Sequence, residues 1–145
     1  MTSTVRQLLQ NKGSMVYAIS PEATVFEALE RMAAYDVGAL LVMKDDHLVG
    51  IFSERDYARK IVLMGRMSKD TRVREVMTSE LITVTPEATV ADCMTLMTGN
   101  RIRHLPVLEN GKLVGVVSIG DVVKAIMTQQ ELMIAELESY ITGSR

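Results

Sequence analysis

Hydrophobic residues in the second half of the chain follow two spacings, one helical and one strand-like. Apolar residues at three- and four-residue intervals after Pro86 predict an amphipathic helix that begins at this proline and stops at Gly99-Asn100. The runs RHLPVL and KLVGVVS, joined by the turn ENG, predict a β-hairpin in which Gly111 adopts a positive φ. The short helix VREVM and the β-rich run LITVT precede this group, and a helix capped by Ser118 follows it. The predicted order is helix, strand, helix, strand, strand, helix.

The first half of the chain repeats this pattern. The run PEATV occurs at 21–25 and again at 86–90, and the same offset of 65 positions aligns the two halves without a gap. A period this long that occurs only twice is unlike a solenoid, so it predicts two copies of one supersecondary unit, each too small to bury its apolar face alone. The offset pairs Gly50 with Gly115, Ser53 with Ser118, and Asp56 with Asp121.

The two copies differ in length near their starts. VRQLL at 5–9 resembles VREVM at 73–77 at an offset of 68, so the first copy carries three extra residues in the loop QNKGSMVY. After the second copy, Met133, Leu137 and Ile141 recur at four-residue intervals. This spacing predicts a C-terminal amphipathic helix that docks on the pair or on another subunit.

Composition narrows the class of protein. Apolar residues make up 48% and charged residues 23% of the 145 residues, as in soluble globular proteins, and no apolar run approaches the roughly 18 residues of a membrane span. The net charge of −2 and the pI near 5.7 argue against nucleic-acid binding. The N-terminus lacks the layout of a signal peptide, so we expect a cytoplasmic protein without membrane or nucleic-acid partners.

Few residues indicate metal or nucleophile chemistry. The single Cys93 aligns with Ala28 of the other copy, which predicts a small buried residue. The two histidines and the cysteine are separated, so they predict no zinc site, and His47 is expected to be exposed in a turn. No nucleophile with a base and no set of paired carboxylates is recognisable. We therefore expect neither an enzyme nor a catalytic cofactor.

The repeated Ser-x-x-Asp motif has two interpretations. In one, the serine caps a helix and the aspartate three residues later faces the helix dipole. In the other, the strand-to-helix turn aims backbone N–H groups and a hydroxyl at a phosphate, while the aspartate accepts hydrogen bonds from vicinal hydroxyls such as those of a ribose. The motif by itself leaves both interpretations open.

The whole chain resembles a tandem pair of CBS (cystathionine β-synthase-type) domains. The motifs that carry the resemblance are VREVMTSELITVTPEATV, NRIRHLPVLENGKLVGVVSIGDVV and YDVGALLVMKDDHLVGIFSERDYARKI. Residues 5–62 resemble the first domain and 73–128 the second, and 129–142 form the C-terminal helix. The resemblance implies an α/β (α+β) fold of two pseudo-twofold-related units, each a small sheet with helices. It also implies two clefts between the units that bind adenosine-type ligands: AMP, ADP, ATP or NAD(H).

The same resemblance implies roles for single residues. Asp56 and Asp121 hold ribose hydroxyls, one per cleft, while Ser53 and Ser118 meet phosphate. The segment from Thr78 to Ile82 closes the adenine slot. Backbone of the second strand of each copy lines the slot, at Val37, Gly38 and Ala39 and at Ile102, Arg103, His104 and Pro106. The first copy departs from the second by having Leu41 where the second has Pro106.

The two clefts differ in charge. Arg55, with the later Arg59-Lys60, belongs to the first cleft, and Arg103 and His104 belong to the second. This pair fits either a solvated strand edge or a phosphate site. If His104 faces a phosphate, its ordinary pKa near 6.5 predicts that affinity rises as the pH falls from about 8 to about 6.

The expected function is an adenine-nucleotide sensor that signals to a partner through a change in the angle between the two units. The alternative is a structural, protein-interaction CBS module without a ligand. The two predicted long helices offer more apolar positions than one core needs, so we also expect a homodimer. These apolar faces lie around Val25, Ala28, Leu29 and Met32, and around Val90, Met94 and Met97.

Overall fold

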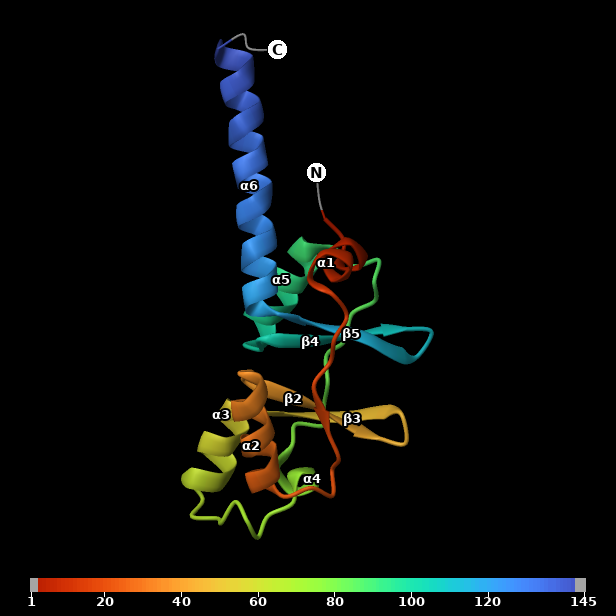
Figure 1. Cartoon of the computed structure of the whole chain (residues 1–145), viewed down its shortest axis with the longest axis vertical. Coiled ribbons are helices and arrows are strands. Elements are labelled where there is room, and N and C mark those ends of the chain that lie inside the picture. Colours follow the sequence, from red (N-terminus) through yellow and green to blue (C-terminus); the bar gives the residue numbers. More distant parts are fainter. Residues whose placement is uncertain (1–2, 143–145) are drawn as a thin grey trace.

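Two β-hairpins stacked one above the other form the centre of the molecule (Figure 1). The computed structural model describes residues 3–142. The hairpins are antiparallel, and each has a register shift at the same place in the repeat, between Val42 and Met43 and between Val107 and Leu108. The two hairpins and two small sheets confirm the predicted α/β fold built from a duplicated unit. The strands are β1 (Ala18–Ile19), β2 (Ala39–Lys44), β3 (His47–Ser53), β4 (His104–Glu109) and β5 (Lys112–Ser118).

One long helix in each unit packs on its hairpin, α2 (Val25–Tyr35) in the first and α5 (Val90–Asn100) in the second. The prediction that Pro86 opens the second helix is wrong. That helix begins at Val90, because Thr89 caps it in a reciprocal capping box with Asp92. The carbonyl of Pro86 instead accepts a hydrogen bond from the Arg6 N–H, 2.9 Å away.

The predicted first strand forms in only one copy. Ala18 and Ile19 pair in parallel with Leu41 and Val42. In the second copy the run at 81–85 contributes only an isolated parallel bridge between Val84 and Val107, so the prediction of a second short strand is wrong.

The short helices that open the two repeats are exchanged between the units. The chain passes from α1 (Val5–Lys12) in the upper unit down to β1, and later returns from α4 (Val73–Val76) in the lower unit (Figure 1). Val5 packs in the core of the second copy, and Val73 packs in the core of the first. Equivalent backbone bonds hold both helices: the Val5 N–H donates to the Ala88 carbonyl at 2.8 Å, and the Val73 N–H to the Ala23 carbonyl at 2.9 Å.

The last helix of each repeat differs most. In the first copy the short α3 (Glu54–Asp56) continues as a π-helix, η1 (Tyr57–Val62). In the second copy α6 is one unbroken helix, Ile119–Thr142, so the predicted segment at 129–142 is a continuation and not a separate helix. Its C-terminal half extends away from both units (Figure 1). Within residues 3–142, none of the helices combines the length and hydropathy that a membrane span requires.

The buried residues confirm part of the sequence interpretation and correct another part. Cys93 is fully buried, as predicted, and burial raises the pKa of its thiol to about 11, with Asp92 adding to the shift. His47 is exposed. The residues of α2 and α5 that were expected to form a dimer face are mostly core, because Val25, Ala28 and Met32 are at most 4% exposed.

Candidate functional site

A cavity of about 590 Å³ lies between the two units. Both Ser-x-x-Asp helix starts border it, through Ser53 in the first copy and Ser118 in the second. The segment that follows α4 forms another part of its wall. Because residues from both repeats line the same space, a ligand in it would contact both units. The lining residues of the first repeat and of the following segment include Gly38, Ile51, Glu54, Arg55, Asp56, Thr78, Glu80, Leu81 and Ile82.

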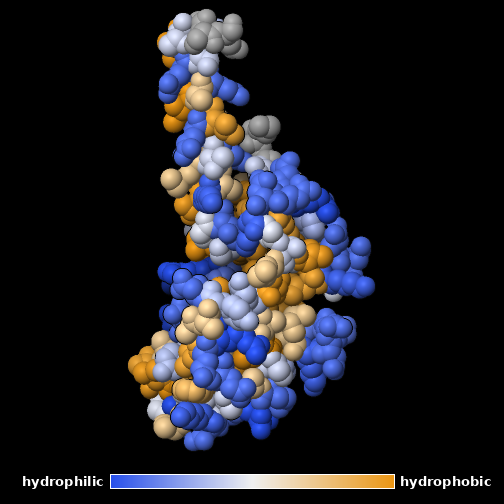
Figure 2. Space-filling model, in the orientation of Figure 1, coloured by the Kyte–Doolittle hydropathy of each residue, from blue (hydrophilic) through white to orange (hydrophobic). Residues whose placement is uncertain are grey.

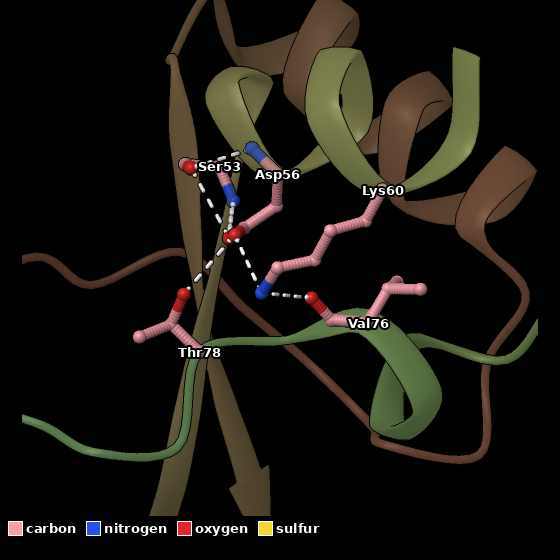
Figure 3. Close-up of polar contacts among 5 residues, drawn as sticks. All are labelled: Ser53, Asp56, Lys60, Val76 and Thr78. Atoms are coloured by element: carbon pink, nitrogen blue, oxygen red, sulfur yellow. Dashed lines mark hydrogen bonds and ion pairs between the residues drawn. The ribbon is translucent and has the colours of Figure 1, made fainter. Parts of the chain in front are cut away.

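The carboxylate of Asp56 is the most enclosed polar group at this cavity. Its Oδ2 accepts hydrogen bonds from the backbone N–H and the hydroxyl of Ser53, both at 3.1 Å. Its Oδ1 accepts from the Thr78 hydroxyl at 3.0 Å and lies 3.0 Å from the Lys60 ammonium (Figure 3). Lys60 also donates to the Val76 carbonyl at 2.9 Å. A ribose that binds Asp56 must therefore replace one of these partners, and Thr78 also lines the cavity.

Asp121, the repeat equivalent of Asp56, has different partners. Its Oδ2 accepts from the Ser118 N–H at 2.8 Å, and it pairs at 2.7 Å with Lys12, which comes from α1. Burial opposes ionisation of this carboxyl, but the hydrogen bonds from Lys12 and Ser118 outweigh it and hold the pKa of Asp121 below its usual value. Both motifs thus form the predicted helix cap, which leaves the ligand-binding interpretation as a separate question.

Three arginines and three carboxylates line the cavity. Arg55, Arg101 and Arg103 supply positive charge, and Glu54, Asp56 and Glu80 supply an equal number of negative charges. Arg55 crosses between the units, because its Nη1 donates to the carbonyl of Arg101 at 2.8 Å. Arg101 sits in the left-handed region at φ 55°, where it ends α5. Its repeat equivalent Asp36 ends α2 in the same way, at φ 54°.

His104 lies on the wall of this cavity, at the start of β4 and opposite Ser118. Burial lowers the pKa of His104 below its ordinary value. Asp121 opposes this shift, and Lys12 and Arg103 add to it. The lowered pKa favours the neutral imidazole. An increase in affinity between pH 8 and pH 6 therefore requires a bound anion that raises the pKa again.

Acidification should destabilise the protein partly through His104. The unfolded chain has a histidine pKa near 6.5, whereas the folded protein has a lower one, so the unfolded chain binds more protons at mildly acidic pH. The stability is full above about pH 6.5 and falls as the pH drops below that value. Urea unfolding at pH 7 and pH 5 should show a smaller loss for His104→Gln than for wild type. Equal losses in both proteins would contradict this assignment.

The structure brings most of the predicted site residues to one cavity. Ten of the fourteen line it. Val37 instead borders a smaller hollow beside α2, together with Gly38. Ala39, Pro106 and Asp121 are not among the residues that line the main cavity, and Pro106 is buried in the β4–β5 pairing. The ten are Gly38, Ser53, Arg55, Asp56, Thr78, Ile82, Ile102, Arg103, His104 and Ser118.

Sequence reasoning missed Arg101 and Lys12. The repeat alignment contains a signal for Arg101, since it pairs this residue with Asp36 directly after each long helix. For Lys12 the only signal in the sequence is its place in the loop that is three residues longer in the first copy.

The duplicated unit and the cavity between its copies define a two-unit binding module of the CBS class. The model of the CBS domain family matches residues 13–63 and again 73–128. The chain therefore belongs to the CBS-domain family, as a tandem pair. This family consists of regulatory, ligand-binding modules.

Individual relatives agree with this membership. A CBS domain-containing protein of Arabidopsis thaliana, CBSX3, named as mitochondrial, is 42% identical over 98% of this chain and 73% of its own length. A CBS-domain protein from Burkholderia ambifaria has a solved structure that is 47% identical, with a TM-score of 0.85 over 88% of this chain and 96% of that one. A hexameric CBS-CP12 protein from bloom-forming cyanobacteria is 28% identical, with a TM-score of 0.75 over 85% and 67% of the two chains.

Proposed function

We propose that the chain is an adenine-nucleotide-binding regulatory module, with the nucleotide held in the cavity between the two units. The observation that carries this proposal is a cavity bordered by both Ser-x-x-Asp helix starts, by the buried Asp56 carboxylate and by three arginines. Its volume of about 590 Å³ falls within the roughly 300–1,000 Å³ of small-molecule sites.

Each part of a nucleotide has matching groups on the wall. Ile51, Leu81, Ile82 and Ile102 provide apolar surface for an adenine ring. Asp56 supplies the acceptor for the ribose hydroxyls, in exchange for the Thr78 hydroxyl. The phosphate belongs at the start of α6, where Ser118, Ile119 and Gly120 line the cavity and the helix dipole is positive.

The bond from Arg55 to the Arg101 carbonyl suggests how binding alters the protein. It joins the two units across the cavity. A phosphate competes for Arg55, because a charge-assisted bond to an anion is stronger than a bond to a neutral carbonyl. The ligand then favours an arrangement of the units without this bond, and a partner distinguishes the two arrangements through its differential affinity. The proposal includes no catalytic step, so the nucleotide is released unchanged.

Mass spectrometry of ligands released from the purified, denatured protein tests the function, together with calorimetry using AMP, ATP and NAD(H). We expect an adenine nucleotide to be recovered or to bind. If none is recovered and none binds, the chain is the alternative, a structural CBS module without a ligand.

We also propose that the chain is a homodimer joined along α6. Val123, Met127, Ile134, Leu137 and Ile141 recur at the alternating four- and three-residue steps of a coiled coil, with Gln130 completing the stripe, and each of these five apolar residues is at least 42% exposed. Figure 2 shows hydrophobic side chains along the projecting part of this helix.

A second copy in parallel fits the charges beside the stripe. Glu131 and Glu138 flank it on one side and Met133 and Tyr140 on the other. In a parallel pair each glutamate faces an apolar residue of the partner, whereas an antiparallel pair brings glutamates face to face. The hexameric CBS-CP12 relative supports the idea that pairs of this kind assemble.

Shortening one residue of the stripe should weaken the dimer. Ile134→Ala removes apolar area from both copies at once, so we expect the dimer dissociation constant to rise roughly tenfold. Leu132→Ala is the matched control, because Leu132 is 61% exposed on the opposite face of the helix. Sedimentation equilibrium measures both. A monomeric wild type, or equal effects of the two substitutions, would refute association along this stripe.

A further inference from the structure

The surroundings of the two repeated aspartates differ in one respect that the repeat itself does not explain. Near Asp56, helix α4 ends at Val76. Two residues later, Thr78 pairs with Ile51 through two backbone hydrogen bonds of 2.9 and 2.8 Å. The Thr78 hydroxyl then reaches Asp56. Thr78, a neutral, short side chain on the wall of the cavity, therefore lies next to the Asp56 carboxylate, which also pairs with Lys60.

Beside Asp121, the helix does not end at the equivalent place. Helix α1 spans eight residues against four in α4, and its last residue is Lys12. The Lys12 ammonium donates to the carbonyl of Val116 at 2.9 Å and to Asp121 at 2.7 Å. Val116 is the repeat equivalent of Ile51. One ammonium therefore takes the positions that the backbone N–H and the hydroxyl of Thr78 hold in the other copy.

The sequence explains the replacement. Lys12 falls within the loop that carries three extra residues, which allow α1 to continue toward β5. The second copy also has no cation of its own at this place, since Ala125 is the equivalent of Lys60. The ammonium that neutralises Asp121 is supplied from 109 residues away.

We infer that Lys12 blocks ribose binding at Asp121, so that each chain binds one nucleotide, at Asp56. This inference rests on the proposed function. A ribose at Asp121 would have to displace both the ion pair with Lys12 and the bond from Lys12 to the Val116 carbonyl. Lys60 makes a similar ion pair with Asp56 and also donates to the Val76 carbonyl. The difference is that Asp56 still borders the cavity beside Thr78, whereas Asp121 is not among the lining residues.

The test is the number of AMP molecules bound per chain, measured by equilibrium dialysis at saturating AMP. We expect one for wild type and two for Lys12→Ala, with the second lost again in Lys12→Ala/Asp121→Asn. Lys12→Met keeps the apolar stem and removes only the charge, so it should also bind two. Lys44→Ala, an exposed lysine of the β2–β3 hairpin, is the control and should bind one.

Equal numbers for wild type and both Lys12 variants overturn the inference. If every variant binds one AMP per chain, or every variant binds two, the proposed function is retained. If no variant binds AMP, the proposed function is contradicted as well. A thermal melt of each variant verifies that the fold is retained before the dialysis is interpreted.

Discussion

Asp56→Asn should weaken AMP binding about 10- to 150-fold. Hydrogen bonds to a charged group contribute roughly 1.5–3 kcal/mol, and each 1.4 kcal/mol corresponds to a factor of ten in affinity. The amide keeps the shape of the carboxylate but removes its charge and one acceptor oxygen, on which a ribose and Lys60 both depend. Calorimetric titration with AMP measures the change.

The control for this prediction is Asp46→Asn. Asp46 lies in the exposed β2–β3 turn at φ 64°, a conformation that asparagine tolerates. The Asp46→Asn protein should therefore bind AMP with the affinity of wild type. Because Asp56 is only 6% exposed, its substitution also alters stability, and melts without nucleotide separate the two effects. Unchanged binding in a folded Asp56→Asn protein would show that this carboxylate does not hold the ligand.

Val5→Ala and Val73→Ala should each lower the free energy of unfolding by about 2 kcal/mol, and each should weaken the unit that is distant in sequence. Both valines are fully buried, and deletion of buried methyl groups loses their transfer energy and leaves a cavity. Val5 packs in the core of the second copy and Val73 in the core of the first.

Hydrogen exchange identifies which unit is weakened. Val5→Ala should reduce the protection of amides in β4 and β5, and Val73→Ala of those in β2 and β3. Each variant serves as the control for the other. The opposite pattern, in which Val5→Ala loosens β2 and β3 first, would be incompatible with exchanged helices.

The sequence predicts the hairpins well because their signals are local. In the second copy, two β runs and a turn with Asn110-Gly111 in the left-handed region are sufficient. The repeat extends the prediction to the first copy, where Asp45 and Asp46 take the left-handed conformation instead. The start of α5 was misplaced at Pro86 although the T-x-x-D capping box at Thr89 was present in the sequence. A proline in a first turn is weaker evidence than a capping pair, because Pro also fits the turn that precedes a helix.

The exchange of α1 and α4 could not be predicted from the repeat. Two copies of one pattern offer each short helix two similar apolar surfaces, and the pattern of apolar residues is the same for either choice. The pairing of Lys12 with Asp121 depends on this exchange, so the sequence pattern does not predict it either. The Asp56 cavity was easier to predict, because most of its wall comes from motifs that the family resemblance already marks.

The exchanged helices also bear on how a cut chain would behave. The link between the copies is exposed at Leu63, Met64 and Met67, so it is the natural place for a protease to cleave. Each resulting fragment would carry the short helix that completes the other fragment's core. The pieces would therefore remain associated as a noncovalent heterodimer, and the two halves expressed separately should assemble on mixing. A chain that lost one copy would leave the other copy without the short helix that completes its core.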